Sequence, residues 1–251
     1  MQRSSSALRT PLPALQNRLL EALPAWDYSL IAPLLAAVDL ERGRLLYDPG
    51  DRIDTVYFPV DGVISLMTLM ENGAAIESAT IGREGALGLM AAVAPRQSLS
   101  RAIVQTPTRA VRIGAAQLHE AWEKSPRIKD LVDRHHEALF GHAIQSVACN
   151  ALHSVEARFC RWLLSCHDRI STDTVALTQE FLADMLGVQR TTVTTIARAL
   201  QDKGFIRSRR GVVDIVNRAG LEASACECYG VMRATYERLT PRGAAKRALP
   251  L

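Results

Sequence analysis

The sequence has no long apolar run and no secretion signal. No stretch approaches the ~18 consecutive apolar residues of a membrane helix. The first twenty residues, MQRSSSALRTPLPALQNRLL, lack the continuous apolar core of a signal peptide. The five cysteines are odd in number, which without such a signal disfavours a disulfide framework. These absences predict a cytoplasmic protein with no membrane partner.

The sequence also lacks the common motifs of enzymes. It contains no GxSxG, no P-loop and no HExxH, and its acidic residues show no pairing suited to general acid–base chemistry. One rival function is an enzyme with a cupin-like metal site, but residues 44 to 113, where such strands would lie, contain no histidine. We therefore predict neither an enzyme nor a cofactor or metal.

Charge is distributed unevenly along a composition that is ordinary for a folded protein. The net charge of +4 says little by itself, but residues 39 to 88 hold nine acidic and four basic side chains, whereas residues 190 to 218 hold two acidic and seven basic. A basic segment behind an acidic body favours a polyanionic partner near the C-terminal end. The alternative is a solvated surface whose asymmetry arose by chance.

The N-terminal half changes its pattern once. Residues 12 to 38 have apolar side chains at three- and four-residue spacing, which predicts helix. From 44 to 113 short apolar runs alternate with turn signals such as Asp61-Gly62 and Asn72-Gly73, which predicts a small all-β barrel or sandwich. A strand near 101 to 113 would close it.

A long apolar stripe follows between residues 115 and 152. The helix that carries it starts near Ser125-Pro126 and is long enough to bury its stripe against a second copy of the chain. Packing within the same chain is the alternative. Further on, residues 155 to 170 predict another helix, and a last helix is expected from about Asn217 to Leu239.

The segment LTQEFLADMLGVQRTTVTTIARALQDKGFI, residues 177 to 206, predicts a helix-turn-helix. Thr178 is placed to cap the first helix, and Gly187 supplies the turn before the second. The second helix begins with polar residues that have no role in a core, and in this motif that turn meets DNA bases. The residues expected to face DNA are Gln189, Arg190, Thr191, Thr192, Thr194, Thr195 and Arg198.

The next residues, IRSRRGVVDIV, predict a β-hairpin wing with a cationic tip. We assign Arg207, Arg209 and Arg210 to phosphate contacts. Gln189, Arg190, Thr191 and Thr194 are assigned to base or near-base contacts, since Gln suits adenine and Arg suits guanine. The alternatives are a helical hairpin with a plain polar face, and a signal sensor whose winged helix docks protein rather than DNA.

Together, these segments resemble the Crp/Fnr family of bacterial transcription regulators over nearly the whole chain. DPGD at 48 to 51 and VYFPVDGVIS at 56 to 65 are similar to its early β-roll strands. The resemblance implies an α+β fold: an N-terminal β-roll sensor domain (12–124), a dimerisation helix (125–153) and a C-terminal winged helix-turn-helix (154–240). It also implies a homodimer on a palindromic site in double-stranded DNA, with a signal acting at the β-roll and RNA polymerase as a further partner.

Two departures from the family pattern bear on specificity. Many members begin the recognition helix with Arg-Glu-Thr-Val, but here the residues from 190 to 193 read Arg-Thr-Thr-Val, so a different base preference is expected. Cyclic-nucleotide binders carry a Gly-Glu motif followed by an Arg-Ser or Arg-Thr pair. Gly82, Glu84 and Gly85 are the candidates for a ligand site here, but no such pair follows. Cyclic nucleotide binding is therefore not expected.

Cysteine and histidine give weaker indications. Cys226 and Cys228 would point apart on a helix, so we expect inert buried thiols rather than two ligands of one metal ion. Family members that hold an iron–sulfur cluster have cysteines near the N-terminus, whereas the first cysteine here is Cys149, so no cluster is expected. Five histidines gather around the long helix: His135, His136, His142, His153 and His167. The pair seven residues apart, 135 and 142, shares a face, which favours polar positions along a dimer seam over a haem or metal ligand.

Overall fold

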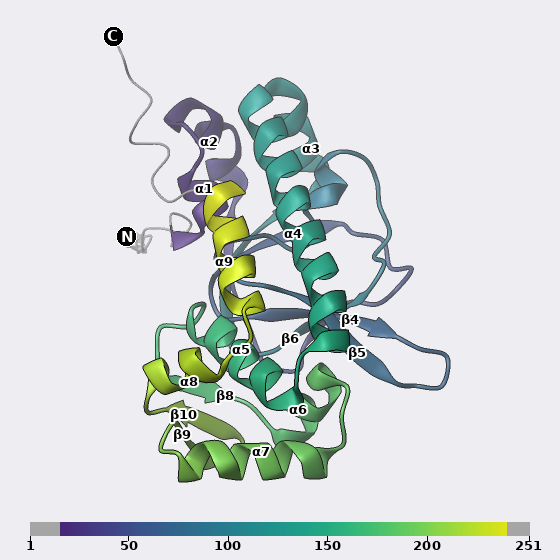
Figure 1. Ribbon diagram of the computed structural model, residues 1–251. Helices are drawn as coiled ribbons and strands as arrows, with labels where there is room; N and C mark the ends of the chain where they lie inside the picture. The colour runs from purple at the N-terminus through teal and green to yellow at the C-terminus, as the bar shows by residue number, and fades with distance from the viewer. Residues whose placement is uncertain (1–15, 240–251) are drawn as a thin grey trace, which may run out of the picture.

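The computed structural model describes residues 16–239 and has the α+β architecture expected (Figure 1). A β-rich N-terminal part is followed by one long helix and a small C-terminal domain with a three-stranded sheet. The N-terminal elements are α1 (Arg18–Glu21), α2 (Ala25–Ile31), η2 (Ala32–Leu34), β1 (Ala36–Leu40), β2 (Leu45–Tyr47), β3 (Thr55–Asp61), β4 (Ile64–Leu69), β5 (Ala75–Ile81), η3 (Leu89–Ala92), β6 (Arg101–Val104), β7 (Thr108–Gly114) and α3 (Ala115–Lys124). The remaining elements are α4 (Pro126–Leu152), α5 (Val155–His167), β8 (Thr174–Ala176), α6 (Gln179–Leu186), α7 (Arg190–Asp202), β9 (Ile206–Arg209), β10 (Val212–Ile215), α8 (Arg218–Ser224) and α9 (Cys228–Leu239).

The β-roll consists of two antiparallel sheets with strand orders β1-β7-β3 and β2-β6-β4-β5. Val56, Phe58 and Val111 point into the core beneath the first sheet. The predicted Asp-Gly and Asn-Gly turns are confirmed, and Gly62 adopts a φ of 110° that a residue with a side chain rarely reaches. The segment expected to close the roll forms two strands, β6 and β7.

The helical prediction for residues 12 to 38 is wrong at its C-terminal end. Residues 12 to 15 lie outside the described part of the chain, and helix ends at η2. Ala36–Leu40 is strand β1, with Val38 opposite Ala110 of β7. Short apolar spacing does not distinguish a helix from a strand there, and hydrogen bonding to the β7 edge decides in favour of the strand.

The long helix is α4, and Ser125 caps it by accepting a hydrogen bond from the Ile128 N–H (3.0 Å). One face packs on the β-roll core through residues such as Val132. The opposite face is apolar and exposed along its C-terminal half, where Phe140 is 69%, Ile144 55%, Val147 72% and Leu152 79% exposed. No helix within residues 16–239 is long and apolar enough to cross a membrane.

The histidines of α4 do not lie on this exposed face, so their placement along a seam between copies is wrong for two of them. His135 Nε2 lies 3.0 Å from the Ala86 carbonyl, and His142 Nδ1 lies 3.4 Å from the Tyr236 hydroxyl. Burial lowers the pKa of His135 to about 4 and that of His142 to about 3. Both are neutral groups packed inside their own chain.

The C-terminal domain has the strand order β8-β10-β9, and α9 lies beside α4 (Figure 1). The single helix expected from Asn217 to Leu239 is in fact two. The N–H of Ala225 bonds to Leu221 and ends α8, residues 225 to 227 are not helical, and α9 begins at Cys228. Apolar spacing continues across this break, which is why the sequence did not reveal it.

Candidate nucleic-acid interface

The helix-turn-helix forms from local sequence signals. Thr178 Oγ1 accepts a hydrogen bond from the Phe181 N–H (3.2 Å) and caps α6, and Gly187, with φ 63° and ψ 40°, ends it in the left-handed region. Helix α7 then buries Val193, Ala197 and Leu200. These contacts fix the direction of the opposite face of α7.

That opposite face is polar and exposed. Gln189 stands at the N-cap of α7 and makes no capping bond, so no side chain within residues 16–239 satisfies the N–H groups of the first turn. The predicted residues in this region are exposed except Thr192, which is half-buried: Gln189, Arg190, Thr191, Thr194, Thr195 and Arg198. Helix α7 lies along the edge of the molecule farthest from the β-roll (Figure 1).

Two threonine hydroxyls of this face are already engaged. Thr194 Oγ1 donates to Gln179 Oε1 (2.8 Å), and Thr195 Oγ1 donates to the Thr191 carbonyl (3.1 Å). Their methyl groups are then the parts best suited to contact a base. Gln179, at the start of α6, did not stand out in the sequence because only the folded pair of helices places it beside Thr194.

The wing has the predicted cationic tip. Val212 pairs with Arg209 across a two-residue turn, Arg210-Gly211. Within the described residues, neither Arg207 nor Arg210 makes a side-chain hydrogen bond or ion pair. Arg209 differs, because its guanidinium bonds both oxygens of Asp214 (2.8 and 2.6 Å) and thereby lowers the pKa of that carboxyl.

A groove of about 480 Å³ connects the two helices with the wing. Gln179 and Arg190 line it from the helices, and Arg209 and Arg210 line it from the hairpin. The structure therefore brings residues predicted to read bases and residues predicted to hold phosphates onto one surface. Four guanidinium groups there lack an ion pair in the described chain: those of Arg190, Arg198, Arg207 and Arg210.

The β-roll candidates lie elsewhere, at the junction with the C-terminal domain. Glu84 accepts hydrogen bonds from buried Arg169 (2.8 Å from Nε), and the backbone of Gly82 packs against the same arginine side chain. Burial alone raises the pKa of Glu84, but the charge and hydrogen bonds of Arg169 outweigh it, and the net shift is downward. Gly85 faces His135.

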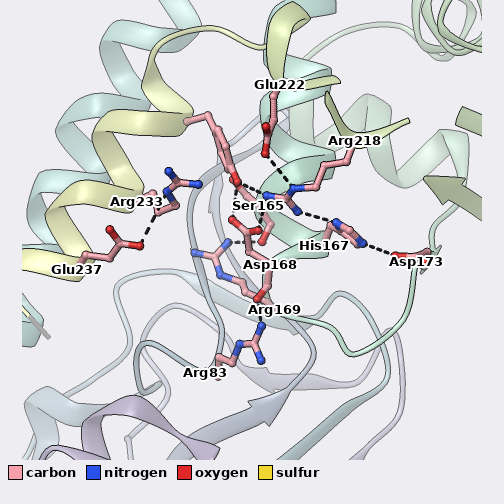
Figure 2. Close-up of polar contacts among 11 residues, drawn as sticks. Arg83, Ser165, His167, Asp168, Arg169, Asp173, Arg218, Glu222, Arg233 and Glu237 are labelled. Carbon is pink, nitrogen blue, oxygen red and sulfur yellow. Dashed lines mark hydrogen bonds and ion pairs between the residues drawn. The ribbon is translucent and has the colours of Figure 1, made fainter. Parts of the chain in front are cut away.

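More charged groups extend this junction (Figure 2). The Arg83 guanidinium donates to the backbone carbonyl of Asp168, whose carboxylate accepts from Arg218 (2.8 Å) at the start of α8. Deeper in the junction, Glu77 of β5 accepts from the indole of Trp162 in α5 (3.0 Å), and burial raises the pKa of Glu77 to about 7. The two domains thus share a buried polar interface.

A separate cavity of about 390 Å³ opens in the β-roll beside α4. Its lining is largely apolar, with Tyr47, Leu66 and Leu139 among its residues, and of the described arginines only Arg96 lines it. Gly82, Glu84 and Gly85 are not among its lining residues.

Known proteins match both halves of the chain. Residues 37–125 match the cyclic nucleotide-binding domain model, and residues 157–224 match that of the Crp-like helix-turn-helix domain. A global nitrogen regulator from Nostoc is 24% identical over 176 residues, covering 66% of this chain and 78% of its own. A regulator of the Crp/Fnr family from Eubacterium rectale has a similar fold, with a TM-score of 0.63 at 18% identity over 82% of this chain and 96% of its own. FixK2 from Bradyrhizobium japonicum also has a similar fold, with a TM-score of 0.65 at 17% identity over 76% of this chain and 98% of its own.

Proposed function

The chain belongs to the Crp/Fnr family of DNA-binding transcription regulators, and from that premise we propose that it binds a two-fold symmetric duplex site as a homodimer. The observation that carries this proposal is the groove where Arg190 of α7 and Arg210 of the wing meet, both without an ion pair among residues 16–239. A dimer related by a two-fold axis presents two such surfaces, which suit half-sites about one helical turn apart.

Within each half-site, α7 reads bases and the wing holds phosphates. Arg190 stands in the first turn of α7, exposed and without an ion pair to any described residue, and a bidentate contact to guanine suits its guanidinium. Arg207 and Arg210 supply charge at the wing that is independent of sequence. Gln189, Thr191 and Thr194 complete the base-facing set, and RNA polymerase remains a predicted partner.

The exposed apolar face of α4 supports the homodimer. Its first half carries charged side chains such as Asp133 and Arg134, whereas from Phe140 onward the exposed positions are apolar. An apolar stripe of this kind suits a parallel helix pair. Ile144→Glu is expected to convert a dimer into a monomer in sedimentation experiments, and the control Asp133→Ala is expected to leave the dimer intact.

Regulation is assigned to the β-roll cavity. One exposed guanidinium on a mostly apolar lining suits a small, largely apolar effector better than a cyclic phosphodiester, whose charge needs a buried cation. Titration calorimetry with cyclic AMP and cyclic GMP is expected to show no binding at concentrations that saturate nucleotide-dependent members of the family.

The deciding experiment is selection of bound duplexes from a random DNA pool by the purified protein. A palindromic consensus that Arg190→Ala weakens or loses would support the proposal. Recovery that is independent of sequence and equal for the protein and for Arg190→Ala would contradict base reading by α7. No binding to duplex DNA at low salt would favour a winged helix that docks protein.

A further inference from the structure

Four side chains with metal-binding atoms meet where α4 ends. Cys149, His153, Cys226 and Cys228 each offer one atom, and these four atoms all lie within 4.8 Å of one another. Cys149 Sγ lies 3.5 Å from Cys226 Sγ, and Cys228 Sγ lies 3.5 Å from His153 Nδ1. We propose that these residues bind one thiophilic divalent metal ion of the Zn²⁺ type.

The spacing of the atoms suits a single tetrahedral ion. Bonds of about 2.3 Å to sulfur and 2.0–2.1 Å to nitrogen place neighbouring ligand atoms roughly 3.6–3.8 Å apart. The Cys149–Cys226 and Cys228–His153 contacts, both at 3.5 Å, are close to that range. An iron–sulfur cluster distributes its cysteines over separate iron atoms and needs wider spacing. A mononuclear site therefore fits best.

The structure overturns the reason for expecting that Cys226 and Cys228 cannot bind the same metal ion. That expectation placed both on one helix, where residues two apart diverge. Cys226 instead lies in the break between α8 and α9, and Cys228 is the first residue of α9. The non-helical residues between α8 and α9 let both sulfurs face Cys149.

The surroundings orient the ligands as they do in metal sites. Gln145 Nε2 donates a hydrogen bond to Cys228 Sγ (3.0 Å), which suits a sulfur that accepts as a thiolate. His153 Nε2 lies 3.9 Å from a carboxylate oxygen of Glu227, so Nδ1 points toward the sulfurs. A carboxylate near the far nitrogen of a metal-bound imidazole is common in metal sites.

The local charge balance also favours an anionic centre. Three thiolates with one divalent ion carry a net charge of −1. Arg158 and Arg161 are buried, interact electrostatically with Cys149, and make no ion pair within residues 16–239. Arg161 also acts on Glu77 but without salt-bridge contact. Thiolates bound to the ion would offset part of the positive charge of these buried guanidinium groups.

The position of the site gives the ion a defined structural role. Cys149 lies in the last turn of α4 and His153 is its C-cap, directly before the helix-turn-helix domain begins. Cys226 and Cys228 come from the far end of that domain. A bound ion would lock the junction between the two. The metal-binding proposal does not depend on the proposed function. Only an effect of the metal on DNA affinity would depend on it.

The test is a Co²⁺ titration of the reduced full-length protein, followed by absorption spectroscopy. We expect one equivalent to bind per chain, with sulfur-to-cobalt charge-transfer bands and the visible bands of a tetrahedral site, and Zn²⁺ to displace it. Cys149→Ala and Cys228→Ala should abolish the spectrum. Cys160→Ala and Cys166→Ala remove buried thiols of α5 outside the site and should leave it unchanged.

His153→Ala guards against loss of signal through misfolding, because this side chain is partly exposed. It should weaken Co²⁺ binding by roughly tenfold or more while the circular dichroism spectrum stays that of the unmodified protein. Absence of a tetrahedral spectrum in the reduced protein would overturn the proposal. Equal losses of the Co²⁺ spectrum in the site variants and in the control variants would also overturn it. A protein that contains a Cys149–Cys226 disulfide and takes up no Co²⁺ after reduction would do the same.

Discussion

Arginine has opposite surroundings at the domain junction and at the surface of α7 and the wing, which we propose faces DNA. Arg169 is 7% exposed and is held by Glu84, Thr80 and a backbone carbonyl. Arg190 is exposed and makes no side-chain hydrogen bond in the described chain. The first kind of arginine holds domains together, and the second is free to bind a partner. Charge at the junction should therefore govern stability, whereas charge on α7 and the wing should govern affinity.

The largest effect is expected at the junction. Glu84→Ala leaves the buried Arg169 guanidinium without its partner, and we expect unfolding to become about 3–5 kcal/mol easier. Urea denaturation measures this. Glu71→Ala, at an exposed turn of the same domain, is the matched control and should change little. Equal shifts in both variants would remove the distinction between the two regions.

A pH-dependent effect is expected at Glu77. Its pKa rises from 4.5 to about 7 on folding because it is buried, so its contribution is favourable below about pH 4.5 and is lost as the pH rises through 7. This loss approaches about 3 kcal/mol. Glu77→Gln keeps an oxygen for Trp162 and should gain stability over the parent between about pH 5 and pH 8. Parallel stability curves for the two proteins would show that Glu77 does not carry this dependence.

At the DNA-facing surface, Arg190→Ala should leave stability unchanged and weaken the preferred duplex by about 1–3 kcal/mol, with relaxed specificity at one base pair. Fluorescence anisotropy with the selected duplex and single-base variants measures both effects. Arg127→Ala, an exposed arginine at the start of α4, is the control. A uniform loss over all duplexes would place Arg190 among the phosphate contacts.

The smallest effects separate the arginines of the wing. Arg210→Ala should weaken all duplexes alike and reduce the slope of log affinity against log salt by about 1. Arg209→Ala should do less, because Asp214 already holds that guanidinium. Asp214→Asn frees it and should strengthen binding to every duplex at low salt. If Arg209→Ala and Arg210→Ala reduce the slope equally, Arg209 leaves Asp214 when the protein binds and contacts DNA as Arg210 does.

The sequence predicts the helix-turn-helix better than the junction because the signals of the helix-turn-helix are local. A cap at Thr178 and a glycine at 187 lie nine residues apart and determine one turn. Glu84 and Arg169, by contrast, are 85 residues apart, and Cys149 and Cys226 are 77 apart. No spacing rule connects them, so only the packing of α5 and α9 against the β-roll and α4 reveals these contacts.

Helix α4 reaches from the β-roll to the winged helix as one rigid rod. Its 27 residues span about 40 Å at a rise of 1.5 Å per residue. Pivoted at the β-roll end, such a rod moves its far end about 0.7 Å for each degree of tilt. A tilt of about five degrees thus displaces the far end of α4 by roughly one base-pair step, a distance of about 3.4 Å. In the proposed homodimer, a tilt of this size changes how two recognition helices match the spacing of their half-sites.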